Sequence, residues 1–185
     1  NHAITYVPSL DLYLDSTATP IAAGYLPIPE LGKPVVLTQS GKLARTPSRQ
    51  LSQVDGALVF KINPQGAADF TNDNTVQGWG TEFNRFLFKS MTPTDRSQLT
   101  QKVLSMYGQT GSGEIETDPL DSNAPTFKST VTGRTENLVN LPGPTGVPTL
   151  SSLAGGIGQN VFSFISEKDR TQSFSCASGT IKETA

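Results

Sequence analysis

Alternation of apolar and polar positions predicts that the middle of the chain is rich in β-strands. The longest alternating stretches are residues 51–62 and 67–77, and a turn sequence at 63–66 separates them. Two such stretches across a short turn are typical of an antiparallel hairpin. Shorter stretches of the same kind at 114–117 and 126–135 are expected to extend the same sheet.

Between these strands, helical periodicity predicts two helices, over residues 81–90 and 93–107. Thr92 is expected to cap the second helix, with Pro93 in its first helical position, and Gly108 is expected to end it. The helix residues expected to face the sheet are Phe83, Phe86, Leu87, Leu99, Val103, Leu104 and Tyr107, and the sheet residues expected to meet them are Leu58, Phe60, Ile62, Phe70 and Val76.

These elements indicate an α+β fold, in which an antiparallel, sandwich-like β-sheet carries two helices on one face. We expect two units, with a boundary after residue 46: residues 1–46 and a C-terminal domain of residues 47–185. Short strands are also expected at 33–38 and 42–46, at 161–165, at 172–176 and at 180–184, and a Pro- and Gly-rich surface loop at 140–159.

Residues 1–15 alternate well enough to form a further hairpin. A two-residue turn at Pro8-Ser9 would place His2 directly opposite Asp15, and a four-residue loop would shift the pairing by two. Because side-chain direction has a period of two, both loops leave His2 and Asp15 on one face of the hairpin. A carboxylate beside an imidazole can orient the ring and stabilise its charged form, although a simple surface ion pair would have the same sequence.

Composition and charge exclude several classes of partner and functional site. The chain has 185 residues, 14 basic and 16 acidic, for a net charge of −2, which excludes a basic nucleic-acid footprint. No apolar run approaches the roughly 20 residues of a membrane-spanning helix. One cysteine, Cys176, and one histidine exclude an internal disulfide and a Cys/His zinc site of known spacing, and no cofactor or metal is predicted. The glycines at 108–113 are expected to form a helix stop and loop. A phosphate loop would need a lysine, a preceding strand and a following helix, and the sequence around these glycines predicts none of them.

The start of the chain resembles a known family. Residues 1–8 (NHAITYVP) and 12–18 (LYLDSTA) resemble the end of a bacterial transglutaminase-like core, in which a histidine opens one strand and an aspartate closes the next. Residues 24–27 (GYLP) and 32–37 (GKPVVL) are similar to the segment that follows that core in exported bacterial proteins. Weaker likenesses to a later domain lie at 140–143 (NLPG) and 174–179 (FSCASG).

The resemblance implies that His2 is a general base and that Asp15 orients it. The family's nucleophilic cysteine precedes the histidine, whereas Cys176 follows it, so Cys176 is not expected to be that nucleophile. Small residues flank Cys176 at strand spacing, which indicates a buried, inert thiol. The chain would then be the non-catalytic C-terminal portion of a periplasmic or cell-envelope protein. Its expected partners are the upstream part of the same protein and a protein or peptide substrate. The alternative is a β-rich binding or scaffolding module of an exported bacterial protein, with no catalytic role.

Overall fold

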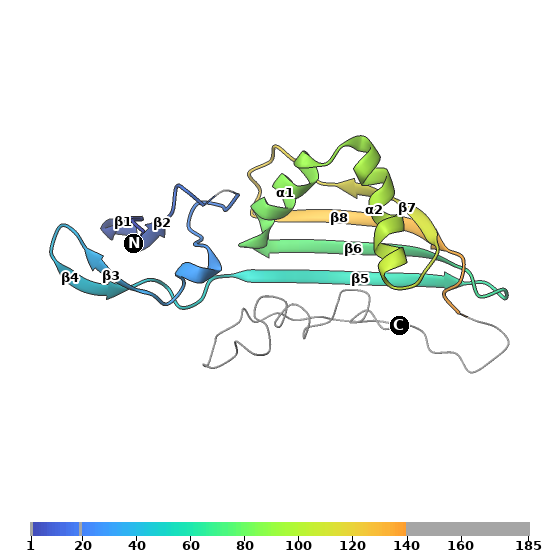
Figure 1. The fold of residues 1–185 in the computed structure, drawn as a ribbon, viewed down its shortest axis with the longest axis horizontal. Coiled ribbons are helices and arrows are strands. Elements are labelled where there is room, and N and C mark those ends of the chain that lie inside the picture. The colour runs from blue at the N-terminus through green and yellow to red at the C-terminus, as the bar shows by residue number, and fades with distance from the viewer. Residues whose placement is uncertain (1, 19, 140–185) are drawn as a thin grey trace.

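The computed structural model describes residues 2–18 and 20–139, which form three antiparallel sheets and two helices (Figure 1). The expected α+β class is therefore confirmed. The strands and short 3-10 helices of the first part are β1 (Thr5–Val7), η1 (Pro8–Leu10), β2 (Leu12–Leu14), η2 (Ile28–Glu30), β3 (Pro34–Leu37) and β4 (Lys42–Arg45). The second part holds β5 (Ser52–Ile62), β6 (Ala68–Gly78), α1 (Gly80–Ser90), α2 (Pro93–Met106), β7 (Gly111–Thr117) and β8 (Thr126–Thr135).

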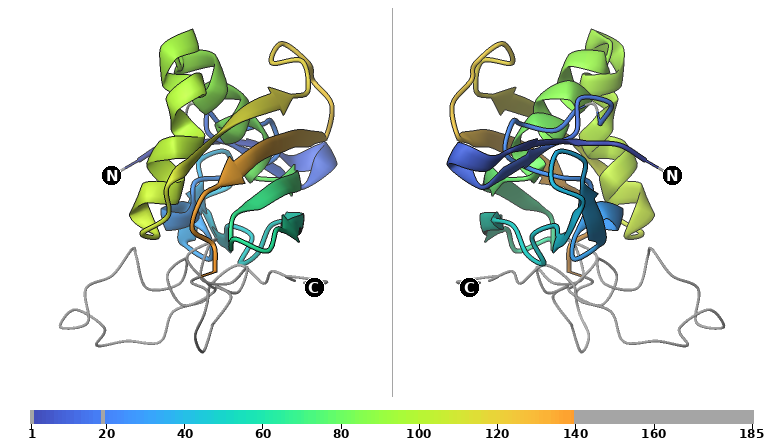
Figure 2. Two further views of the ribbon diagram at one scale, coloured as in Figure 1. Left: turned by 90° about the vertical axis from the view of Figure 1, so that its right-hand side faces the viewer. Right: turned by 90° about the vertical axis from the view of Figure 1, so that its left-hand side faces the viewer.

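The largest sheet has four strands in the order β5-β6-β8-β7, all antiparallel. Strands β5 and β6 form the expected hairpin, and β7 and β8 extend it as the alternation predicts. Both helices lie over the same face of this sheet (Figures 1 and 2). The apolar face and the helices therefore form a two-layer core around Leu58, Phe70 and Leu104.

The other face of the large sheet is polar. Thr130 and Asp73 are directly opposed on neighbouring strands, and the Thr130 hydroxyl donates a 2.6 Å hydrogen bond to the Asp73 carboxylate. Arg134 and Asp69 form a second opposed pair, with 3.4 Å between Nη1 and Oδ1. A sheet that helices cover on one face only needs apolar side chains on that face and polar side chains on the face exposed to solvent.

Helix α1 buries a different stripe from the one expected. Phe83 and Phe86 are 45% and 51% exposed, and Leu87 is also exposed, whereas Arg85 and Phe88 are buried. The expectation that Phe83, Phe86 and Leu87 face the sheet was wrong, because Arg85 and Phe88 occupy the packed face of α1 instead.

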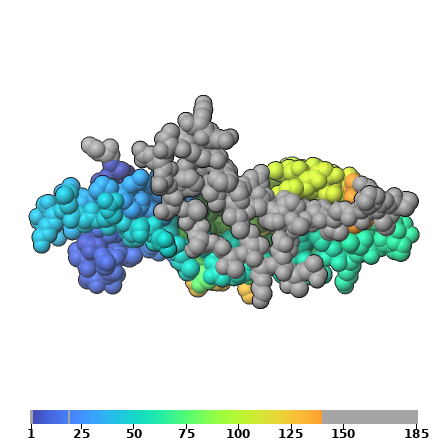
Figure 3. All heavy atoms as spheres, turned by 90° about the horizontal axis from the view of Figure 1, so that it is seen from below, coloured from blue at the N-terminus to red at the C-terminus, as the bar shows by residue number. Residues whose placement is uncertain are grey.

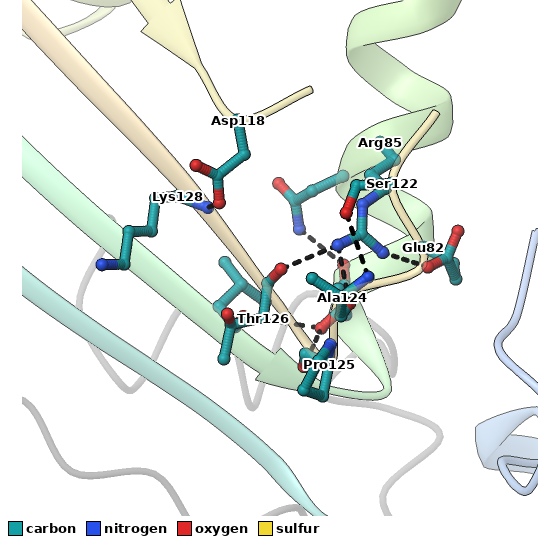
Figure 4. Close-up of polar contacts among 12 residues, drawn as sticks. Glu82, Arg85, Asp118, Ser122, Ala124, Pro125, Thr126 and Lys128 are labelled. Atoms are coloured by element: carbon teal, nitrogen blue, oxygen red, sulfur yellow. Dashed lines mark hydrogen bonds and ion pairs between the residues drawn. The ribbon is translucent and has the colours of Figure 1, made fainter. Parts of the chain in front are cut away.

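Arg85 is tolerated there because both terminal nitrogens of its guanidinium have partners, although its Nε has none among the described residues (Figure 4). Its Nη2 donates 2.7 Å hydrogen bonds to the carbonyl oxygens of Ala124 and Thr126, and its Nη1 pairs with Glu82. The guanidinium carbon also lies 6.0 Å from the ring centre of Phe127. Arg85 thus ties α1 to the start of β8, and burial of its charge is compensated by these partners.

Helix α2 begins as the sequence predicts. The Thr92 hydroxyl accepts a hydrogen bond from the Asp95 amide at 3.1 Å, and the Asp95 carboxylate accepts one from the Thr92 amide at 3.2 Å. This reciprocal capping box satisfies two amides that the helix leaves without partners. The helix ends before Gly108, which has a φ of +70°. Leu104 is buried as expected, but Val103 is 41% exposed, which corrects its expected inward position.

Residues 111–113 belong to strand β7 rather than to the expected loop. A Cβ atom at Gly111 would lie 2.9 Å from Leu104 Cδ1, and one at Gly113 would lie 3.0 Å from Thr100 Cγ2. The glycines therefore let α2 approach the backbone of β7 closely. A glycine-rich stretch reads as a loop in the sequence, because nothing local reveals a helix packed against it.

The first 46 residues contain two small hairpins, β1–β2 and β3–β4. Among residues 2–18 and 20–139, none of their strands pairs with the four-stranded sheet. The Gln50 side chain connects the two parts, since its amide group exchanges hydrogen bonds of 2.9 and 2.7 Å with the backbone of buried Leu26. In the space-filling view of Figure 3, the small hairpins gather at one end of the molecule beside the large sheet. The proposed domain boundary after residue 46 stays an interpretation.

Within the described part of the chain, the longest helix is α2, with 14 residues. No helix there is long and apolar enough to cross a membrane. The strands expected beyond residue 160 and the loop at 140–159 lie outside the described residues.

Candidate functional site

The β1–β2 hairpin brings the two ends of the first segment together. Val7 pairs with Leu12, so the chain reverses through four residues, and this settles which of the two possible loops is used. Pro8 begins a 3-10 turn, and Asp11 closes it in the left-handed conformation at a φ of 48°. A two-residue primed turn would need positive φ values, which the proline ring excludes.

Asp15 follows β2 directly, and neighbouring groups hold its carboxylate in place. Its Oδ1 accepts hydrogen bonds from the Thr17 amide at 2.9 Å and the Thr17 hydroxyl at 2.7 Å. Its Oδ2 lies 3.0 Å from His2 Nε2, and only 3% of the Asp15 side chain is exposed. The Thr17 donors, with a smaller contribution from His2, hold the pKa of Asp15 well below its usual range. Asp15 is therefore a fixed, ionised acceptor at neutral pH.

The side chain of His2 is partly accessible to solvent. Its side chain is 48% exposed, and its Nε2 makes the contact with Asp15. The ring nitrogen that remains to meet another group is Nδ1. An imidazole oriented through one nitrogen and open at the other is the arrangement that a general base requires.

Glu30 is a third member that the sequence analysis missed. Its Oε1 lies 3.2 Å from the same His2 Nε2. Burial, together with the hydrogen bond and negative charge of Asp15, raises the pKa of Glu30. Glu30 is the last residue of the short 3-10 helix η2, in a proline-containing segment without periodicity, so no local pattern marks it as a neighbour of His2.

Thr46 positions the backbone of Glu30. The Thr46 hydroxyl donates a 2.6 Å hydrogen bond to the Glu30 carbonyl and accepts a 2.8 Å bond from the Lys33 amide. Only 3% of Thr46 is exposed. The loop that carries Glu30 is thus fixed against the end of the β3–β4 hairpin.

The structure therefore brings both predicted site residues together and adds a third. His2, Asp15 and Glu30 each offer a ligand atom, and these atoms all lie within 4.8 Å of one another. Cys176 lies outside the described residues. Asp118, which follows β7, has a structural role, because its carboxylate accepts a 2.9 Å hydrogen bond from the Lys128 amide (Figure 4).

No family model, curated protein or solved structure matches this chain. Its function is therefore inferred from the geometry of His2, Asp15 and Glu30 and from the resemblance of residues 1–37.

Proposed function

We propose that this chain supplies the histidine base and the orienting carboxylate of a Cys-His-Asp triad, as the C-terminal portion of a transglutaminase-like protein. The nucleophilic cysteine would come from an upstream segment of the same protein. The observation that supports this most is the 3.0 Å contact between His2 Nε2 and Asp15 Oδ2 on an accessible hairpin face. The chain alone is then not an enzyme.

In this scheme the two residues have distinct chemical roles. The cysteine thiol gives its proton to His2 Nδ1, and the thiolate attacks an amide carbonyl carbon. The imidazolium then protonates the departing amine, which leaves a thioester on the cysteine. An incoming amine or water breaks the thioester, and the thiol is regained. Asp15 stabilises the imidazolium formed between these steps, and its Thr17 hydrogen bonds keep the carboxylate ionised and oriented.

The substrate proposed for this chemistry is a protein or peptide amide, and the proposed location is the bacterial periplasm or cell envelope. The exposure of the His2 side chain, 48%, is compatible with a macromolecular substrate.

Amine incorporation into a glutamine-containing peptide tests the proposal in the protein extended through its upstream segment. A fluorescent primary amine reports transamidation, and ammonia release reports hydrolysis. His2→Ala should abolish both reactions. Asp15→Asn should retain the contact geometry but lose most activity, because a neutral amide does not stabilise the imidazolium.

Asp11→Asn is the matched control, because Asp11 lies in the same hairpin and its carboxylate contacts only the Tyr6 hydroxyl among the described residues, at 2.8 Å. Asparagine also tolerates the left-handed backbone at this position. Its activity should equal that of the wild type. Full activity in His2→Ala would refute the triad.

A binding or scaffolding module remains the second candidate, and the exposed aromatic residues of α1 favour it. Phe83 and Phe86 are 45% and 51% exposed, and the Phe83 ring stacks on that of the half-buried Trp79, with ring centres 6.2 Å apart. Aromatic side chains presented to solvent are typical of contact surfaces for proteins. If this is the function, Phe83→Ser with Phe86→Ser should abolish partner binding, whereas His2→Ala should leave it unchanged.

A further inference from the structure

The triad leaves Glu30 unexplained. Two carboxylates converge on a single nitrogen, at 3.0 Å for Asp15 and 3.2 Å for Glu30, although orientation of an imidazole needs only one. The second Glu30 oxygen, Oε2, is buried and has no hydrogen-bond partner among the described residues. Such a buried oxygen without a partner is costly unless something else neutralises it.

We propose that His2, Asp15 and Glu30 form a binding site for a divalent zinc ion. One imidazole nitrogen and two carboxylate oxygens are a ligand set that zinc accepts, with water in the fourth position. Ligand atoms at zinc bonding distances in a tetrahedron are about 3.3–3.5 Å apart. The 3.0 and 3.2 Å separations therefore need to open by only a few tenths of an ångström.

The supporting hydrogen bonds already hold two of the three ligands as zinc requires. Thr17 fixes one oxygen of Asp15 and leaves Oδ2 directed toward the site. Thr46 fixes the backbone that carries Glu30. Hydrogen bonds that orient ligands from outside the metal site raise metal affinity, because less order must be gained on binding.

Charge supports the same occupant. Two carboxylates converge on one imidazole, and a divalent cation bound to all three would neutralise the two carboxylate charges. The site does not depend on the proposed thiol chemistry, because none of its ligands is the cysteine. A zinc ion on His2 Nε2 would, however, replace the Asp15 contact, so bound zinc should inhibit the proposed triad.

Titration of the tag-free 185-residue chain with Co²⁺ tests the site without any activity assay. Four-coordinate Co²⁺ gives intense visible absorption, and Zn²⁺ added afterwards should remove it by displacement. We expect saturation at one equivalent. Loss of a supporting residue outside a metal site typically costs about 10–100-fold in affinity, so Glu30→Gln and His2→Ala, which remove direct ligands, should each cost at least as much.

Asp11→Asn is again the control and should bind Co²⁺ like the wild type. Circular dichroism verifies folding of each variant, and Asp15→Asn replaces any variant that does not fold. Because the chain has one histidine, the imidazole signals of His2 give an independent NMR readout, which should change with the first equivalent of Zn²⁺. Absence of saturable Co²⁺ binding, or equal binding by wild type, Glu30→Gln and His2→Ala, would overturn the proposal. If the activity assays refute the triad but Co²⁺ still binds, the zinc-site proposal stands.

Discussion

The carboxylate of Asp15 and the imidazole of His2 are 13 residues apart in sequence and 3.0 Å apart in space. The pairing of β1 with β2 creates this contact, and Thr17 fixes the direction of the carboxylate. One oxygen of Asp15 is thus committed to Thr17 and the other to His2. Both proposed roles of the site, proton transfer and zinc binding, depend on this division.

Glu30→Gln should stabilise the metal-free protein at neutral pH. Burial and the Asp15 carboxylate raise the pKa of Glu30, so ionisation of Glu30 opposes folding. The stability gained with a protonated Glu30 is present below the ordinary glutamate pKa and is lost as the pH rises through the raised value. In chelator-treated samples, the Glu30→Gln melting temperature should exceed that of the wild type at pH 7 and match it in acid.

Glu114→Gln on β7 is the control for this comparison, since Glu114 is exposed and distant in sequence from the site. Its melting temperature should follow that of the wild type at every pH. A lower melting temperature for Glu30→Gln than for the wild type at pH 7 would show that the Glu30 charge favours the folded state.

Phe127→Ala should strongly destabilise the large sheet. Phe127 is only 1% exposed, and its ring centre lies 5.7 Å from that of Phe88 on α1. Removal of a buried phenylalanine side chain costs about 3–5 kcal/mol. Chemical denaturation should show this loss, whereas Phe86→Ala on the exposed side of α1 should change the unfolding free energy by roughly 0.5 kcal/mol or less. Equal effects would contradict the packing of α1.

Thr92→Ala should cost about 1 kcal/mol of unfolding free energy, because it removes the cap of α2. The Thr92 hydroxyl and amide also lower the pKa of Asp95. The stability this provides is present above the ordinary aspartate pKa and is lost as the pH falls through the lowered value. The difference in unfolding free energy between wild type and Thr92→Ala should therefore shrink in acid. Thr94→Ala, two residues further along the chain, is the control and should show no such pH dependence.

Gly133→Ala should destabilise the sheet without removing any contact. A Cβ atom there would lie 2.4 Å from the Ser112 carbonyl oxygen and 2.7 Å from Phe70 Cζ. Overpacking of this kind typically costs about 1–3 kcal/mol. The denaturation midpoint should fall for Gly133→Ala and stay nearly constant for Thr132→Ala, its exposed neighbour. An unchanged midpoint for Gly133→Ala would show that both the Ser112 carbonyl and the Phe70 ring can move aside.

Patterns confined to one element predicted the structure well. Alternation located the β5–β6 hairpin, and Thr92 followed by Pro93 located the start of α2, because both signals arise within a few residues. The shared face of His2 and Asp15 was also predictable, since it depends only on the period of a strand.

Contacts between distant segments could not be read in the same way. Arg85 is buried because carbonyl oxygens near residue 125 accept its hydrogen bonds, and helical periodicity assigned that face to Phe83 and Phe86 instead. Glu30 joins the site through a loop held by Thr46, and no spacing in the sequence reports that hydrogen bond. Sequence reasoning therefore found the pair formed within one hairpin and missed the residue supplied by tertiary structure.

The rate of alkylation of the upstream cysteine, measured against pH in the extended protein, tests the central claim most directly. If His2 is its base, the cysteine should react with iodoacetamide well below the ordinary thiol pKa of about 8.5. His2→Ala should return the profile to that of a free thiol, Asp15→Asn should shift it in the same direction, and Asp11→Asn should leave it unchanged. An identical profile in wild type and His2→Ala would contradict the proposed triad.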